Sequence, residues 1–200
     1  MTDEPLILAS ASASRQKLLA AAGLEFCVEP ASIDEAAIKR IFQADRAAAA
    51  DCALALAEAK AREVGRHHQH ALVVGADQIL VCGGRWFNKP TDLGDARDQL
   101  QALRGRTHEL VTAVCAVRET TRIWDTVTSA KLTMRHFSDT FLNAYLGAER
   151  AAILGSVGGY RLEGRGIQLF ADIRGDYFAI LGLPMLDLLS FLRTRGAVAS

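Results

Sequence analysis

Two long segments rich in threonine and valine, residues 108–117 and 121–134, are typical of β-strands and lie only a few residues apart. By contrast, the apolar segments 5–8 and 71–76 are followed or preceded by stretches with helical character. A chain that combines adjacent strands with strands separated by helices is predicted to have an α/β fold with a mixed sheet. Because 50% of its 200 residues are apolar, the chain can bury one sizeable core, and we expect residues 1–200 to form a single domain.

The remaining pattern places the other elements. It predicts helices over 16–22, 47–64, 92–103, 138–146 and 184–193, and strands over 78–82, 167–173 and 177–180. Gly83-Gly84 is typical of a tight turn, and residues 155–166 are typical of a glycine-rich loop region.

The charges exclude one large class of partner. The 23 basic and 23 acidic residues cancel, so the chain lacks the basic stripe that binding to a nucleic-acid polymer requires. A free nucleotide remains possible, because it needs only a few cations in one cleft. No apolar stretch approaches the length of a membrane span, and the 4 cysteines form no C-x-x-C pair. We therefore expect a cytoplasmic protein with reduced, mostly buried thiols and no membrane partner.

The stretch LASASASR at residues 8–15 places Ser10, Ser12, Ser14 and Arg15 between a strand and a helix. A helix N-terminus presents free backbone N–H groups that attract anions, and an arginine side chain matches phosphate oxygens. Capping of the helix accounts for one serine and leaves the other two unexplained. The junction is therefore a candidate phosphate site.

Asp77 follows the apolar strand 71–76, at a strand end where ligands gather in α/β sheets. Such a carboxylate could hold Mg²⁺ or accept a proton from water, and it could equally bond its own backbone in a turn. Lys89, after the Gly83-Gly84 turn, is a weak indicator when taken alone. The same holds for Lys60 in the helix and for Glu35.

Considered jointly, these residues match the charge pattern of a Mg–nucleoside triphosphate site. Separate elements supply three cations and two carboxylates, namely Arg15, Lys60, Lys89, Glu35 and Asp77. Carboxylates that face a polyphosphate repel it unless a cation lies between them, and Mg²⁺ takes one or two carboxylates plus phosphate oxygens and water. Spacing alone leaves open whether the five residues meet.

Other motifs do not point to a site. The chain has no phosphate loop of the form G-x-x-x-x-G-K-[ST] and no G-x-S-x-G elbow. The histidine turn, His67-His68-Gln69-His70, could bind metal, but no acidic or thiol side chain is expected near it. We therefore interpret it as a solvated turn between helix and strand.

Several motifs in order resemble those of the Maf family of nucleoside triphosphate pyrophosphatases. They are Leu8-Ala9-Ser10-Ala11-Ser12-x-x-Arg15, Leu18-Leu19, Ile33-Asp34-Glu35, Leu56-Ala57-x-x-Lys60-Ala61, Gly75-Ala76-Asp77, Lys89-Pro90, Gly105-Arg106-Thr107-His108, Gly158-Gly159-Tyr160 and Gly182-Leu183-Pro184. The resemblance covers nearly the whole chain. It implies a mixed, curved sheet flanked by helices, with two lobes around a deep cleft.

The resemblance also implies an activity and a site. It implies metal-dependent hydrolysis between the α- and β-phosphates, which yields a nucleoside monophosphate and pyrophosphate. By position, Asp77 matches the proton acceptor and, with Glu35, the metal positions. The substrate-binding positions match Ser10, Ser12, Arg15, Lys60 and Lys89. Oxygen ligands favour Mg²⁺ or Mn²⁺ over zinc, and a homodimer is an expectation from the family.

Three departures from the commonest family pattern bear on the base. Ser14 replaces an arginine of S-P-R-R, Gln78 replaces the threonine of G-A-D-T, and Glu163 replaces the glutamine of I-Q-G. The departures resemble the branch that hydrolyses 7-methyl-GTP, whereas the usual residues accompany dTTP and UTP. An ionised glutamate only accepts hydrogen bonds, which suits the N1–H and 2-amino donors of a guanine-type base.

Several alternatives stay open at this point. Glu163 could instead pair with Arg161 or Arg165 on the loop surface. The substrate could be inosine or xanthosine triphosphate, or a canonical pyrimidine triphosphate. The protein could also be a nucleotide-binding regulator of septum formation that needs no turnover.

Overall fold

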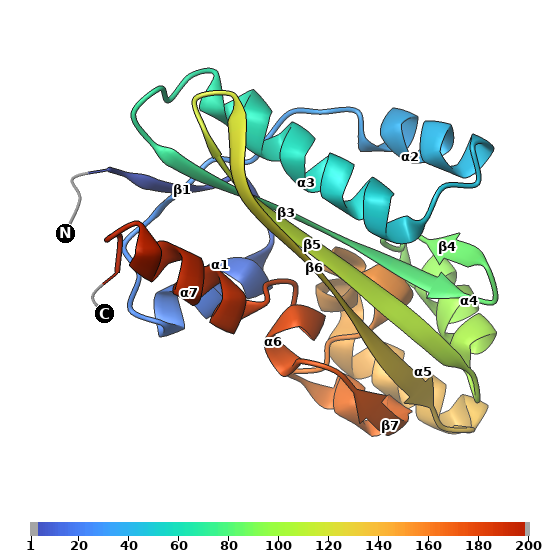
Figure 1. Ribbon diagram of the computed structural model, residues 1–200. Helices are drawn as coiled ribbons and strands as arrows, with labels where there is room; N and C mark the ends of the chain where they lie inside the picture. Colours follow the sequence, from blue (N-terminus) through green and yellow to red (C-terminus); the bar gives the residue numbers. More distant parts are fainter. Residues whose placement is uncertain (1–3, 199–200) are drawn as a thin grey trace. The chain divides into compact units, whose positions relative to one another are not determined.

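The computed structural model describes residues 4–198 (Figure 1). The strands are β1 (Leu6–Leu8), β2 (Cys27–Val28), β3 (Leu72–Cys82), β4 (Arg85–Phe87), β5 (Thr107–Arg118), β6 (Thr121–Met134) and β7 (Phe170–Arg174). The α-helices are α1 (Ala13–Ala21), α2 (Glu35–Ala44), α3 (Ala49–Gly65), α4 (Leu93–Leu103), α5 (Asp139–Glu149), α6 (Tyr177–Ile180) and α7 (Met185–Thr194). Three 3₁₀ segments, η1 (Arg150–Gly155), η2 (Val157–Gly159) and η3 (Arg165–Leu169), complete the described chain.

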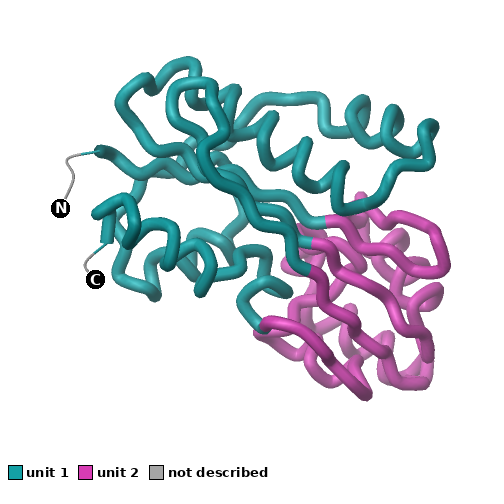
Figure 2. Tube along the Cα trace, viewed as in Figure 1, with its two compact units in different colours: residues 1–78, 112–128, 177–200 teal, residues 79–111, 129–176 magenta. Residues whose placement is uncertain are grey.

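The chain divides into two compact units (Figure 2). Unit 1 consists of residues 1–78, 112–128 and 177–200, and unit 2 of residues 79–111 and 129–176. Strands β3, β5 and β6 each contribute residues to both units. The single domain over residues 1–200 and the deep cleft between lobes remain predictions.

The strands form a seven-stranded sheet in the order β2-β1-β3-β5-β6-β7, with β4 paired to β3. The sheet is mixed, as predicted, because β1 pairs in parallel with β2 and β3, whereas β3–β4 and β6–β7 are antiparallel. The register of β1 on β3 places Leu8 beside Val74. The end of β1 therefore lies beside β3 three residues before Asp77, which lies inside β3 and not at a strand end as the sequence predicts.

Alternate residues of β3 face opposite sides of the sheet. On one side, Leu72, Val74 and Ala76 belong to a buried cluster that includes residues of α1 and α7. On the other side, Gly75 lies against α3, because a Cβ at residue 75 would overlap the carbonyl oxygen of Ala57. Figure 1 accordingly shows α3 on one side of β1 and β3, and α1 and α7 on the other.

Most predicted elements are confirmed. The two long strands, the alanine-rich helix and the last helix appear as β5, β6, α3 and α7. The turn at Gly83 and Gly84 links β3 to β4, and its φ angles of 58° and 78° lie in the left-handed region that glycine adopts readily. Asp92 and Ser138 cap α4 and α5, since their side chains accept hydrogen bonds from the backbone N–H groups of Asp95 and Phe141.

Three predictions of secondary structure are wrong. Residues 78–82 are not a separate strand, because β3 runs without a break from Leu72 through Asp77 to Cys82. Residues 177–180 form α6, in a segment too short for periodicity to separate helix from strand. In the segment 167–173 the residues up to Leu169 belong to η3, and the strand begins only at Phe170.

Candidate active site

Buried polar side chains mark the candidate site in unit 1. Ser10, Arg15, Lys60 and Asp77 are only 7%, 8%, 8% and 5% exposed. Polar groups buried to this degree need partners, because an unpaired buried charge is costly. Four residues proposed from the sequence therefore lie inside the fold.

Lys60 lies between two carboxylates. Its Nζ is 2.6 Å from Oδ1 of Asp77 and 2.9 Å from Oε1 of Glu35. The close approach of α3 to β3 at Gly75 brings Lys60 to Asp77. Glu35 is the first residue of α2, where the helix dipole favours negative charge, and Asp34 caps that helix. The predicted convergence of Glu35, Lys60 and Asp77 is thus observed.

The second carboxylate oxygen of Asp77 is in an unusual position. Oδ2 is buried and has no hydrogen-bond partner among the described residues. A buried carboxylate oxygen is stable only with a donor, a proton or a cation beside it. This atom is therefore the point of the cluster at which a bound water or cation would be stabilised.

Arg15 is held by acceptors of the protein itself. Its Nη1 donates to Oγ of Ser10 at 3.0 Å and to the carbonyl of Ala76 at 2.8 Å, and its Nε donates to the carbonyl of Gly182 at 3.0 Å. Burial lowers the pKa of Arg15, and the charges of Asp77 and Glu35 act in the opposite direction. These bonds fix the plane of the guanidinium group.

The three serines have different surroundings. Ser12 is the N-cap of α1, and its hydroxyl accepts from the backbone N–H of Arg15 at 3.5 Å. Ser10 also accepts from the backbone N–H of Ser12 at 3.3 Å. Ser14 lies in the first turn of α1 and is half-buried. One serine is thus a cap, as the simplest interpretation expects, while Ser10 orients Arg15.

Two residues predicted from the sequence, Lys89 and Glu163, belong to unit 2. Lys89 is exposed and follows β4. Oε1 of Glu163 lies 3.4 Å from Nε of Arg161, the loop pairing that we considered as an alternative to base recognition. Roles for Lys89 and Glu163 in a nucleotide site remain predictions.

Gln78 lies beside Asp77 on β3 and contacts residues that the sequence did not single out. Its Nε2 donates to Oγ1 of Thr112 at 2.8 Å and to the carbonyls of Ala179 and Ile180, both at 3.1 Å. Thr112 is a lone polar residue in the apolar stretch Leu110-Val111-Thr112-Ala113-Val114, which is the sequence feature that could have revealed it.

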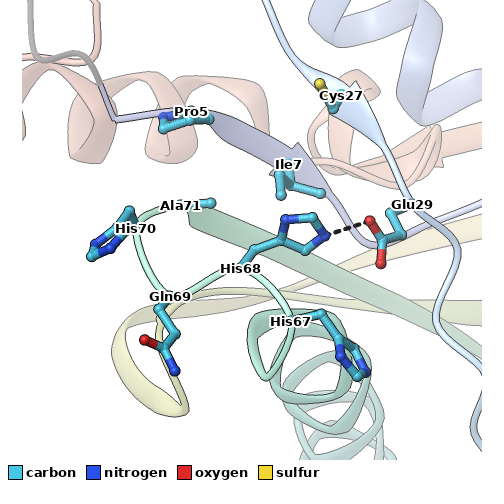
Figure 3. A pocket seen from close by; sticks show the side chains of 9 residues that line it. All are labelled: Pro5, Ile7, Cys27, Glu29, His67, His68, Gln69, His70 and Ala71. Carbon is cyan, nitrogen blue, oxygen red and sulfur yellow. Dashed lines mark hydrogen bonds and ion pairs between the residues drawn. The ribbon is translucent and has the colours of Figure 1, made fainter.

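The interpretation of the histidine turn needs one correction. Figure 3 shows this turn beside a pocket of about 470 Å³, and Nε2 of His68 lies 2.6 Å from Oε2 of Glu29. Cys27 lines the same pocket, so an acidic and a thiol side chain are present, contrary to expectation. Cys27 and Glu29 come from the segment after β1, and a separation of 39 residues between Glu29 and His68 hides their proximity from sequence analysis. Within the described residues, no group of three or more His, Cys, Asp and Glu side chains is placed to hold a metal ion.

The cysteines agree with the sequence interpretation as far as burial goes. Cys52, Cys82 and Cys115 are buried, Cys27 is exposed, and all four are free thiols. Burial raises the pKa of Cys52 to about 11, which leaves its thiol protonated and unreactive at neutral pH. Over residues 4–198, no helix has both the length and the apolar character needed to cross a membrane.

Comparison with known proteins gives the context of this site. A family model described as "Maf-like protein" matches residues 5–195. The "Nucleoside triphosphate pyrophosphatase" of Granulibacter bethesdensis is 50% identical over 193 residues, covering 96% of this chain and 98% of that protein. The "7-methyl-GTP pyrophosphatase" of Rhizobium meliloti is 50% identical over 193 residues, covering 96% of this chain and 97% of that protein. A "Nucleoside triphosphate pyrophosphatase" of Paramagnetospirillum magneticum is 50% identical over 190 residues, covering 95% and 98%.

Proposed function

The chain belongs to the Maf family, and from this premise we propose that it hydrolyses nucleoside triphosphates to a nucleoside monophosphate and pyrophosphate. The observation that carries the proposal is the buried Lys60 between Asp77 and Glu35, with Oδ2 of Asp77 left unpartnered among the described residues. Relatives that share half of its sequence over nearly its whole length carry pyrophosphatase names.

The chemical step assigns a task to Asp77. The oxygen of a water molecule forms a bond to the α-phosphorus, and the bond from that phosphorus to the bridging α–β oxygen breaks. Oδ2 of Asp77 accepts the proton of the water, and pyrophosphate leaves with the bridging oxygen. Lys60 holds the carboxylate in place through Oδ1, which leaves Oδ2 for the proton.

The donor set also fits a divalent cation. Glu35 and Asp77 offer hard carboxylate oxygens, which suit Mg²⁺ or Mn²⁺. Because two protein carboxylates do not complete its coordination, phosphate oxygens and water supply the other ligands. When bound, such a cation would neutralise charge on the triphosphate and favour departure of pyrophosphate.

The remaining residues bind and orient the substrate. Arg15 offers its guanidinium at the start of α1, where Ser12 and Ser14 add hydroxyls, and Lys89 supplies a further cation for the phosphates. We place the reaction in the cytoplasm, since three buried free thiols suit a reducing compartment.

A nucleotide panel tests the function. The purified full-length protein is incubated with 7-methyl-GTP, GTP, ITP, XTP, dTTP and UTP, with Mg²⁺ or with EDTA, and pyrophosphate is measured. We expect release of pyrophosphate with Mg²⁺ and none with EDTA.

Asp77→Asn should lose at least about 100-fold in kcat while still binding nucleotide. Asp51→Asn, at an exposed position in the first turn of α3, should keep full activity. Full activity of Asp77→Asn would reject the assignment.

For the base, we propose a guanine-type substrate such as 7-methyl-GTP, recognised by Glu163. The acceptor-only carboxylate complements the N1–H and 2-amino donors, and N7 methylation adds positive charge that a carboxylate stabilises. The relative from Rhizobium meliloti is named for this nucleotide.

Glu163→Gln tests base recognition against loop pairing. It should lower the ratio of kcat/KM for 7-methyl-GTP to that for dTTP by about tenfold, which corresponds to the loss of one good hydrogen bond. Glu149→Gln is the matched control, because Glu149 also contacts Arg161, at 3.5 Å. Equal shifts in both variants would mean that Arg161 pairing, and not base recognition, sets the preference.

A further inference from the structure

Asp77 and Gln78 are neighbours in sequence but serve opposite faces of the sheet. Successive residues of a strand point to opposite sides. Asp77 contacts Lys60 of α3, whereas Gln78 contacts the carbonyls of α6. The side chain of Gln78 is therefore directed away from the carboxylate cluster.

The chemistry of the Gln78 contacts fixes how its amide is used. Two of its three partners are the backbone carbonyls of Ala179 and Ile180, which only accept, so the nitrogen end of the amide must face them. Oγ1 of Thr112 donates to the carbonyl of Ala179 at 2.9 Å and therefore accepts from Gln78. The donors of Gln78 are committed to this network and are not available to a nucleobase.

The network leads back to Arg15. Helix α6 ends two residues before Gly182, whose carbonyl accepts from Nε of Arg15. Gly182 has a φ of 109°, which side chains rarely adopt, and a Cβ there would lie only 3.0 Å from Nε of Arg15. The position of this carbonyl therefore depends on where α6 lies, and α6 is fastened to β3 and β5 by Gln78 and Thr112.

We propose that Gln78 and Thr112 are positioning residues that hold α6 and, through the Gly182 carbonyl, the guanidinium of Arg15. Gln78 thus influences nucleotide binding through Arg15 and not by contact with the base. The inference rests on the proposed function, because it assigns Arg15 to the phosphates. A threonine at position 78 would carry its hydroxyl on Cβ, too close to the backbone to replace an amide that reaches three acceptors.

Hydrogen exchange tests the first half of the proposal without any turnover. The amides of Leu181, Gly182 and Leu183 bond within the α6 turn, to Tyr177, Ala179 and Phe178. Thr112→Val and Gln78→Thr should each speed their exchange about three- to tenfold, the worth of one neutral hydrogen bond. Thr112→Ser, which keeps the hydroxyl, should restore protection, and Thr126→Val on β6 should leave it unchanged. Unchanged protection in both Thr112→Val and Gln78→Thr would overturn the proposal.

Kinetics tests the second half. If α6 positions Arg15, Thr112→Val should raise KM for the triphosphate about three- to tenfold with kcat nearly unchanged. KM should rise by the same factor for every base. The double variant Gln78→Thr/Thr112→Val should be less damaged than the product of the single effects. A change in KM that differs between bases and occurs only in Gln78→Thr would instead mean that Gln78 contacts the base directly. Absence of pyrophosphate release by the unsubstituted protein would refute the function, while the exchange result on α6 would still stand.

Discussion

Lys60 is the residue on which the charge balance of the site depends. Its side chain is 10% exposed, and that of Asp77 is 7% exposed, so water screens their attraction weakly. Without the ammonium group, Asp77 would be a buried carboxylate with no cation at 2.6 Å. A buried ion pair need not add net stability, but removal of one partner leaves an uncompensated charge.

Lys60→Met should therefore destabilise the protein by about 3 kcal/mol, measured by urea unfolding. Lys17→Met, at an exposed position on α1, should change stability by less than about 0.5 kcal/mol. The double variant Lys60→Met/Asp77→Asn should recover most of the loss, because the unpaired charge is gone. Equal instability of the single and double variants would contradict this account.

His108, in unit 2, predicts a dependence of stability on pH. Its Nε2 lies 2.8 Å from the hydroxyl of Tyr160, and burial lowers its pKa from 6.5 to about 4. Above pH 6.5 the histidine is neutral in both states. Between pH 6.5 and 4 it is protonated only in the unfolded chain, which favours unfolding. The loss grows to about 3 kcal/mol at pH 4 and then levels off.

The measurement is the free energy of unfolding from pH 8 to pH 4, compared between proteins. His108→Gln removes the titrating group, so its curve should fall less steeply in this range than that of the unsubstituted protein. His70→Gln, which removes an exposed histidine, should keep the original steepness. Parallel curves for the unsubstituted protein and His108→Gln would refute this role of the histidine.

At the scale of elements, the contact between α3 and β3 sets the site. Gly75 allows the backbone of β3 to approach Ala57 and Ala61, which lie three residues before and one residue after Lys60 along α3. Gly75→Ala should push α3 away, destabilise the protein by about 2 kcal/mol and lower kcat/KM, because Lys60 is withdrawn from Asp77. Gly147→Ala on α5 is the matched control: a Cβ there meets nothing within 4 Å, so the helix should be slightly more stable. A Gly75→Ala protein with unchanged stability and activity would exclude this packing role.

The sequence predicts elements better than it predicts what their side chains contact. The helix starts near residues 92 and 138 and the turn at Gly83 depend on neighbours in the chain, so local chemistry is enough to predict them. The sequence pattern divides the long β3 in two because it places Asp77 at a strand end, whereas Asp77 lies inside the strand and contacts Lys60 of α3. The contact of Gln78 with α6 could not be foreseen, since about 100 residues separate the partners and no spacing rule covers that distance.

At the scale of the whole molecule, the two compact units are not separate stretches of chain. The chain passes between them at residues 78/79, 111/112, 128/129 and 176/177, and the first three crossings fall inside β3, β5 and β6. Loss of structure in one unit would break ladder hydrogen bonds of strands that also build the other. We therefore predict one cooperative unfolding transition, as expected of a single domain over residues 1–200.

The two tryptophans allow this prediction to be tested unit by unit. Trp124 belongs to unit 1, where it stacks on Phe191 with ring centroids 4.8 Å apart, and Trp86 belongs to unit 2. In Trp86→Phe the fluorescence reports on unit 1 alone, and in Trp124→Phe on unit 2 alone. Within each variant, urea midpoints from fluorescence and from far-UV circular dichroism should coincide, because the shared strands force both units to unfold together.

Thermal unfolding gives a second measurement. The van't Hoff enthalpy at the thermal midpoint should be about 140 kcal/mol, the value for a chain of this length that unfolds as a whole, and not the roughly 60 and 80 kcal/mol of two units that unfold independently. Separate midpoints within one variant would mean that the strands fray at the crossings and that the chain is two domains.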